Sequence, residues 1–173
     1  DEIVKTYGIT SPEDILSILD MKISAVFGTD GTKDGMDISI ITTDNDTNTL
    51  FFAGAKNPLY YVRNNEMHVV KGSRLSVGGS KPNEEKDFGF FEMTMQEEDI
   101  FYIFSDGFQD QFSSREYGTK YLRKRFREFL FKNHQLPLKE QGEELKQEFL
   151  NWKGDYKQTD DILVIGVRPL IND

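Results

Sequence analysis

A short apolar run, residues 100–104, stops abruptly at the sequence Ser105-Asp106-Gly107. Its length and its β-branched and aromatic side chains predict a buried strand over residues 100–105. The strand ends at an acidic residue that is followed by glycine, the residue with the fewest backbone restrictions. Such an arrangement holds the Asp106 carboxylate at the rigid edge of a sheet, which suits a metal ligand.

A second acidic pair lies near the end of the chain. Asp160 and Asp161 directly precede another apolar run, and the pattern predicts a strand over residues 162–167. We expect the two strands to lie side by side and to bring Asp106 and Asp160 together. Successive strand residues point to opposite faces, so Asp161 is expected to point away from Asp160 and to cap a loop or serve as an outer ligand.

Carboxylates are the ligands that Mg²⁺ and Mn²⁺ prefer, and two such ions about 4 Å apart can activate water and hold a phosphoryl group. Asp106, Asp160 and Asp161 are therefore the candidate metal ligands. The simpler alternative is that they are turn residues or helix caps, because aspartate favours those positions.

The overall composition indicates one globular domain over residues 1–173, with 14 Phe available for a core. The formal net charge of −9 argues against nucleic acid or an anionic membrane as a partner, since both attract positive proteins. The chain contains no Cys, which excludes disulfides and thiolate sites and is compatible with a cytoplasmic location. No apolar run approaches the roughly 18 residues that a membrane span needs.

The order of elements predicts an α+β fold, because strands occur in a block with helices grouped before and after it. A helix is expected to start at Ser11-Pro12, and two later helices carry apolar residues at helical spacing. These apolar positions are Leu122, Phe126, Phe129 and Leu130 in the first, and Leu138, Leu145, Phe149 and Trp152 in the second. Strands are expected over residues 36–43, 49–52, 59–63, 66–71, 88–95, 100–105 and 162–167, with residues 53–58 as an interruption and a tight turn at Asn64-Asn65.

Several other candidate sites are weaker. The segment 44–48 imitates the start of an EF-hand loop, but Thr49 and Ala55 stand where that loop needs Gly and Glu, so a hairpin turn is expected. His68 and His134 are expected at the surface, and Asp34 and Asp37 as turn residues. A basic stretch comprises Lys120, Arg123, Lys124, Arg125 and Arg127. We interpret it as a solvated helix face, the alternative being a patch for an acidic partner or regulator.

The motifs in this order resemble a known family. Residues 105–108, with Asp110 and Gln111 after them, are similar to the Ser/Thr-Asp-Gly motif of metal-dependent protein phosphatases of type 2C, and residues 159–162 are similar to their closing Asp-Asn or Asp-Asp motif. The stage II sporulation E-like branch of bacterial serine phosphatases is the most similar. Residues 33–38, 52–59 and 75–78 support the resemblance, which covers nearly the whole chain.

The resemblance implies two antiparallel sheets packed as a sandwich and flanked by helices. It also implies hydrolysis of phosphoserine or phosphothreonine by a water that bridges two Mg²⁺ or Mn²⁺ ions, with Asp106 and Asp160 as ligands. Implied partners are a phosphorylated regulatory protein as substrate and an upstream sensor domain in a longer parent chain. Formation of a homodimer is left open by the sequence.

The sequence departs from the family pattern at its beginning. An early Gly-Asp segment and an Asp-Gly-His-Gly-like segment supply further metal contacts in the family, and neither occurs here. We therefore expect a domain that lacks its N-terminal segment, binds metal weakly and is inactive or nearly so by itself. Two alternatives remain open: a phosphatase-like domain that has lost catalysis and serves as a binding or dimerisation module, and an unrelated acidic α+β domain.

Overall fold

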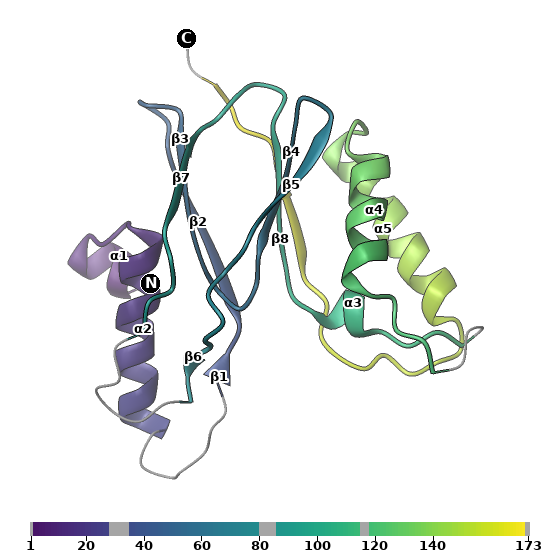
Figure 1. Ribbon diagram of the computed structural model, residues 1–173, viewed down its shortest axis with the longest axis horizontal. Helices are drawn as coiled ribbons and strands as arrows, with labels where there is room; N and C mark the ends of the chain where they lie inside the picture. Colours follow the sequence, from purple (N-terminus) through teal and green to yellow (C-terminus); the bar gives the residue numbers. More distant parts are fainter. Residues whose placement is uncertain (1, 28–34, 80–85, 115–117, 172–173) are drawn as a thin grey trace. The chain divides into compact units, whose positions relative to one another are not determined.

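The computed structural model describes residues 2–27, 35–79, 86–114 and 118–171, and it divides into two compact units. The first unit contains residues 1–59, 69–97 and 169–173, and the second contains residues 60–68 and 98–168. Each unit contains antiparallel strands and its own helices, as Figure 1 shows. This confirms the prediction of an α+β fold built from antiparallel sheets and helices. That residues 1–173 form one domain stays a prediction.

Helices α1 (Glu2–Tyr7) and α2 (Pro12–Phe27) open the first unit. The predicted start of α2 is confirmed: the Ser11 carbonyl accepts the Ile15 amide at 3.0 Å, and the Ser11 Oγ lies 3.5 Å from the Asp14 amide. Nothing in the sequence had indicated α1, which is too short to carry a helical repeat.

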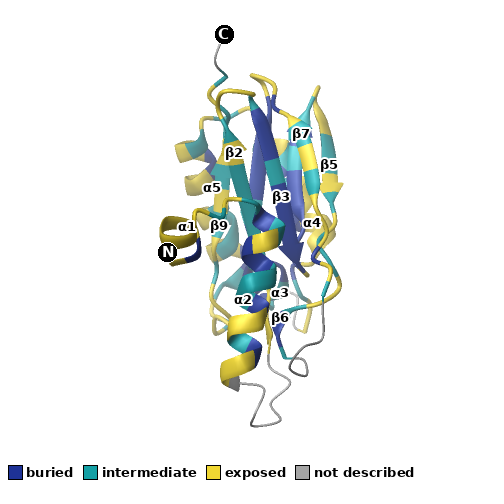
Figure 2. Ribbon diagram, turned by 90° about the vertical axis from the view of Figure 1, so that its left-hand side faces the viewer, coloured by how far each residue is buried: buried dark blue, intermediate teal, exposed yellow. Residues whose placement is uncertain are grey.

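The sheet of the first unit has the strand order β2-β3-β7, with β2 at Ile38–Asp44, β3 at Thr49–Ala55 and β7 at Phe91–Thr94. Figure 2 shows β3 as the buried middle strand. The expected interruption at residues 53–58 is wrong at its start, since β3 continues to Ala55. Gly54 permits this, because a Cβ there would overlap the Asn57 carbonyl oxygen. Helix α2 packs on this sheet through a core of Leu16, Ala53, Ala55, Val77 and Phe88.

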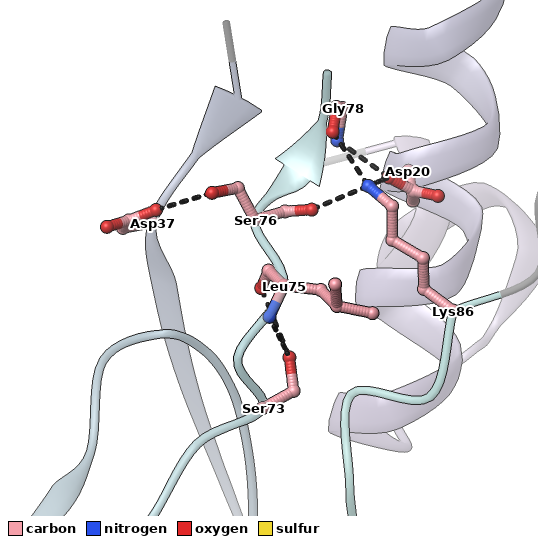
Figure 3. A network of polar contacts seen from close by, with 7 residues as sticks. All are labelled: Asp20, Asp37, Ser73, Leu75, Ser76, Gly78 and Lys86. Atoms are coloured by element: carbon pink, nitrogen blue, oxygen red, sulfur yellow. Dashed lines mark hydrogen bonds and ion pairs between the residues drawn. The ribbon is translucent and has the colours of Figure 1, made fainter. Parts of the chain in front are cut away.

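A buried ion pair ties α2 to the short strand β6 (Val77–Gly78), which pairs with β1 (Gly35–Met36). Lys86 Nζ lies 2.8 Å from Asp20 Oδ1, and it also donates to the carbonyls of Ser76 and Gly78 at 2.7 Å (Figure 3). The Gly78 amide donates to the same Asp20 oxygen at 2.6 Å. The Lys86 ammonium thus has three acceptors, which satisfies all of its protons away from solvent.

The second unit has the strand order β5-β4-β8-β9, with β4 at Leu59–Arg63, β5 at Glu66–Val70, β8 at Ile100–Phe104 and β9 at Val164–Val167. The predicted hairpin turn is confirmed, since Asn64 and Asn65 have φ values of 51° and 58°. Positive φ values at both central residues are typical of the type I′ turn, whose twist matches that of two antiparallel strands.

Three helices follow β8: the single turn α3 (Gly107–Asp110), then α4 (Arg123–Asn133) and α5 (Leu138–Lys153). Helices α4 and α5 cover one face of the sheet (Figure 1). Their core is strongly aromatic and includes Tyr60, Tyr102, Phe104, Phe108, Tyr121, Phe126, Leu130 and Trp152. The placement of Leu122 on the apolar helix face is wrong, because Leu122 precedes α4 and is 56% exposed. None of the helices in the described parts of the chain is long and apolar enough to span a membrane.

Candidate metal centre

Asp106 occupies the junction between β8 and α3. It is the N-terminal cap residue of α3, with φ −78° and ψ −12°, but its side chain makes no capping hydrogen bond. Its carbonyl accepts the Asp110 amide at 3.0 Å, so the backbone is fixed by the helical turn. The half-buried carboxylate is therefore held on a rigid backbone while its oxygens are not used to cap the helix.

The segment around Asp106 lies beside the segment that precedes β9. The amide of Ser105 donates to the Leu163 carbonyl, and the amide of Leu163 donates to Ser105 Oγ, both at 2.9 Å. The same hydroxyl donates to the Asp161 carbonyl at 2.9 Å. Gly107 is required here, because a Cβ would overlap the Asp161 carbonyl oxygen. Residues 105–107 and 161–163 thus run side by side at one end of the sheet.

Asp160 and Asp161 lie before β9 and not on it, because the strand begins at Val164. The prediction of a strand from residue 162 was too long, and strand alternation does not decide where Asp161 points. One Asp160 oxygen accepts the Asp161 amide at 2.7 Å, and Gln158 Nε2 donates to the Asp160 carbonyl at 2.8 Å. Both aspartates are exposed, so solvent can complete the coordination of any ion bound there.

Gln111 holds the stretch that leads to Asp160, a role that the sequence analysis missed. Its side chain is fully buried, and Nε2 donates to the Lys157 carbonyl at 3.1 Å while Oε1 accepts the Thr159 amide at 3.2 Å. The Trp152 indole donates to the Gln111 carbonyl at 2.9 Å. The sequence analysis named Gln111 beside the motif at residues 105–108 but gave it no role, because the role depends on a partner 46 residues away.

The other candidates are not brought to this place. The His68 ring stacks on Tyr61 with centroids 4.7 Å apart, and the His134 ring stacks on Phe131 at 5.1 Å, which makes both half-buried rather than surface residues. The Asp37 carboxylate, in the first unit, accepts from Ser76 Oγ at 2.9 Å, and Asp34 lies outside the described residues.

The predicted turn at residues 44–48 is confirmed. Asp44 Oδ1 accepts the Asp46 amide at 2.8 Å and the Thr47 amide at 3.3 Å, and these bonds hold the pKa of Asp44 below its ordinary value. The carboxylate thus stabilises a hairpin turn, which supports the rejection of a calcium loop.

Asp106, Asp160 and Asp161 offer hard oxygen donors, which are the right kind for Mg²⁺ or Mn²⁺. They are few, however: within the described residues no group of three or more His, Cys, Asp or Glu side chains could hold a metal ion. The three side chains therefore have the chemistry of metal ligands, but they are too few to form a complete metal site. Their role as metal ligands stays a prediction.

A pocket of about 530 Å³ is lined by Asp155, Tyr156, Lys157, Gln158 and Thr159, the residues directly before Asp160. Gln111 fixes the part of this lining that leads to Asp160, through its hydrogen bonds to the backbone of Lys157 and Thr159. The second unit therefore has a hollow next to the candidate ligands, bordered by a stretch that one buried side chain holds in place.

Comparison with known proteins assigns the chain to a family. The sequence model of the stage II sporulation protein E (SpoIIE) family matches residues 5–169. None of the curated proteins compared with the chain matches it. Among solved structures, the SiaA-PP2C domain of Pseudomonas aeruginosa is 28% identical, with a TM-score of 0.85 over 97% of this chain.

Two further structures share the fold at lower identity. The phosphatase domain of the cell fate determinant SpoIIE from Bacillus subtilis is 18% identical, with a TM-score of 0.56 over 96% of this chain and 70% of that one. A Mycobacterium tuberculosis structure containing RsbU and RsbW domains is 15% identical, with a TM-score of 0.70 over 96% of this chain and 44% of that one. This chain spans 65% of the length of the SiaA domain. The match over residues 5–169 shows that the chain belongs to the stage II sporulation protein E family and is a type 2C phosphatase-like domain.

Proposed function

We propose that the chain is part of a Mg²⁺- or Mn²⁺-dependent protein phosphatase that hydrolyses phosphoserine or phosphothreonine in bacterial signalling. The observation that supports this most is the pairing of residues 105–107 with residues 161–163, which brings the segments of Asp106 and Asp160 to one end of a sheet. The family match and the structural relatives add to it.

In this proposal Asp106 and Asp160 bind the cation through their carboxylates, and Asp161 acts as an outer ligand. When bound, the metal ions would supply an activated water and a clamp for the phosphoryl oxygens. Ser105 and Gln111 are positioning residues, because their hydrogen bonds fix the two backbone segments that carry the ligands. Pre-organised ligands bind an ion without the loss of backbone freedom that a mobile loop would suffer.

Two relatives support the choice of metal. Crystals of the Bacillus subtilis SpoIIE phosphatase domain were soaked with Mn, and a structure of RsbX contains magnesium. We extend that preference to this chain, together with a phosphorylated regulatory protein as substrate, a sensor domain in the parent polypeptide and a cytoplasmic location.

A second candidate function is a phosphatase-like module that binds or dimerises without catalysis. The small number of clustered metal-binding side chains in the described residues favours it. A module of this kind would keep the fold while Asp106 and Asp160 served as turn residues.

The test is hydrolysis of a phosphoserine peptide by the 173-residue chain with Mn²⁺, together with Mn²⁺ binding measured by electron paramagnetic resonance. If the chain is part of a longer polypeptide, that polypeptide is assayed in parallel. Asp106→Ala and Asp160→Ala should abolish both turnover and Mn²⁺ binding, whereas Asp14→Ala, at an exposed position of α2 in the first unit, should change neither.

Each outcome selects one of the two functions. Turnover that depends on Asp106 and Asp160 supports the phosphatase. Absence of turnover and of Mn²⁺ binding in every form of the protein would overturn it in favour of the non-catalytic module.

A further inference from the structure

Helix α4 is strongly basic within an acidic chain. Its eleven residues include five basic side chains and one acidic one, Glu128, whereas the whole chain has a net charge of −9. All five basic residues are exposed, and we refer to Arg123, Lys124 and Arg127 as the basic face.

The positions of these charges are unfavourable for the helix itself. Arg123, Lys124 and Arg125 form the first turn, where the helix dipole disfavours cations, and the turn contains no acidic residue. Leu122 precedes the helix without a side-chain cap. Of these three residues, Arg125 has a clear structural role, since its guanidinium lies 4.2 Å from the Trp152 ring centroid. Helix stability therefore does not explain the charges of the basic face.

The basic face is not neutralised within the described residues. Lys124 lies 3.9 Å from Glu128, but both side chains are largely exposed, so the pair is weak. In the described parts of the chain, neither Arg123 nor Arg127 forms an ion pair.

The start of α4, which carries the basic face, is attached to the helical turn that follows Asp106. The Leu122 amide donates to the Gln109 carbonyl at 2.8 Å, and the rings of Phe108 and Phe126 lie 5.0 Å apart. Both contacts attach the start of α4 to α3, the single helical turn that directly follows Asp106 (Figure 1). The path from Asp106 follows one turn of α3, crosses the Leu122–Gln109 hydrogen bond and continues along the first turn of α4, which amounts to about 10–15 Å at about 5 Å for each helical turn. An extended peptide covers that distance in about three to five residues.

We propose that the basic face docks an acidic segment of the protein substrate, with its Asp or Glu residues about three to five positions from the phosphorylated serine. This inference rests on the proposed function and adds a substrate class to it. Charge complementarity supports an acidic partner, because screening over about 8 Å at physiological salt limits the reach of negative charges elsewhere on the chain. A long nucleic acid or a membrane would meet the acidic remainder of the surface as well.

The kinetic test compares two phosphoserine peptides, one with acidic and one with neutral flanks, and p-nitrophenyl phosphate as a small substrate. In the variant Arg123→Glu/Arg127→Glu, the KM for the acidic peptide should rise by about 10-fold or more while kcat stays unchanged. The neutral peptide and p-nitrophenyl phosphate should be unaffected. A glutamate at position 123 suits the start of a helix, so unfolding is not expected to explain the loss. The matched control is Lys139→Glu/Lys146→Glu, which makes the same charge change at exposed positions of α5.

Binding without catalysis separates this inference from the proposed function. Fluorescence anisotropy of a labelled, unphosphorylated acidic peptide should show salt-sensitive binding that the α4 variant loses and the α5 control keeps. If that result is obtained but no form of the protein hydrolyses any substrate, docking stands and the phosphatase proposal fails. Equal binding by the variant and the control, or equal binding of acidic and neutral peptides, would overturn docking. Tighter binding to anionic vesicles or to a DNA duplex, lost in the same variant, would also overturn it in favour of that partner.

Discussion

The hydroxyl of Ser105 donates a hydrogen bond of 2.9 Å to the carbonyl of Asp161, a residue 56 positions further along the chain. The same hydroxyl accepts the Leu163 amide, so one small side chain joins the end of β8 to the segment before β9. The candidate ligands Asp106 and Asp160 each lie one residue from this bond. The geometry of the candidate site therefore depends on two hydrogen bonds to the backbone that a Ser or Thr hydroxyl can make and an apolar side chain cannot.

Gly107→Ala should separate these two segments. The added methyl group would overlap the Asp161 carbonyl oxygen, which is backbone and cannot rotate away. We expect a loss of about 1–3 kcal/mol in the free energy of unfolding, measured by urea denaturation, together with weaker Mn²⁺ binding. The control is Gly142→Ala in α5, where a Cβ meets nothing within 4 Å and should stabilise the helix by roughly 0.5–1 kcal/mol. Equal effects of the two substitutions would contradict the close approach at Gly107.

Gln111→Ala should loosen the stretch that leads to Asp160. The substitution leaves the Lys157 carbonyl and the Thr159 amide without their partner, at a cost of about 1–3 kcal/mol in the free energy of unfolding. Hydrogen exchange should show faster exchange of the Thr159 amide. Gln147→Ala, at an exposed position of α5, should change stability by less than about 0.5 kcal/mol. Unchanged protection at Thr159 would mean that Gln111 does not hold this segment.

Lys86→Met should strongly destabilise the first unit. Its loss leaves the Asp20 carboxylate buried without its cation, which costs about 3–5 kcal/mol in chemical denaturation. The double variant Lys86→Met/Asp20→Leu should lose less than the sum of the single variants, because no unpaired charge remains. By contrast, Lys22→Ala removes an exposed pair with Glu2 and should leave the denaturation midpoint unchanged. A double variant that lost the full sum would show that the two residues act independently.

Alkaline pH should destabilise the second unit. Burial raises the pKa of the Tyr102 and Tyr121 phenols, and a hydrogen bond to Glu148 raises that of Tyr121 further. The unfolded chain ionises these groups near pH 10, whereas the folded chain keeps them neutral. Their contribution to stability is therefore complete below about pH 10 and is lost as the pH rises above it.

Urea unfolding between about pH 8 and about pH 11.5, with tyrosine ionisation followed by absorbance, checks this prediction. Tyr102→Phe/Tyr121→Phe should reduce the alkaline slope. A slope that is the same in the variant and the wild type would assign the alkaline loss to other groups.

Much of the fold could be predicted because its signals are local. The turn at Asn64-Asn65, the start of α2 at Pro12 and the strand before Asp106 all depend on neighbouring residues and their backbone preferences. The errors concern element ends and short elements: Leu122 lies outside α4, β9 begins two residues later than predicted, and neither α1 nor the short strand β6 was predicted. An apolar residue just outside a helix or strand continues the hydrophobic repeat of that element even when its side chain is exposed. The repeat therefore does not show at which residue the element ends.

The sequence alone determined the α+β class, the order of the longer elements and the position of Asp106 at a strand end, since these follow from periodicity and turn chemistry within short windows. Only the tertiary structure decided that residues 105–107 run beside residues 161–163, that Gln111 holds the path to Asp160, and that Lys86 is buried against Asp20. Each of these contacts joins residues between 46 and 66 positions apart. Their existence depends on how separate elements pack against one another, and no local preference along the chain encodes that.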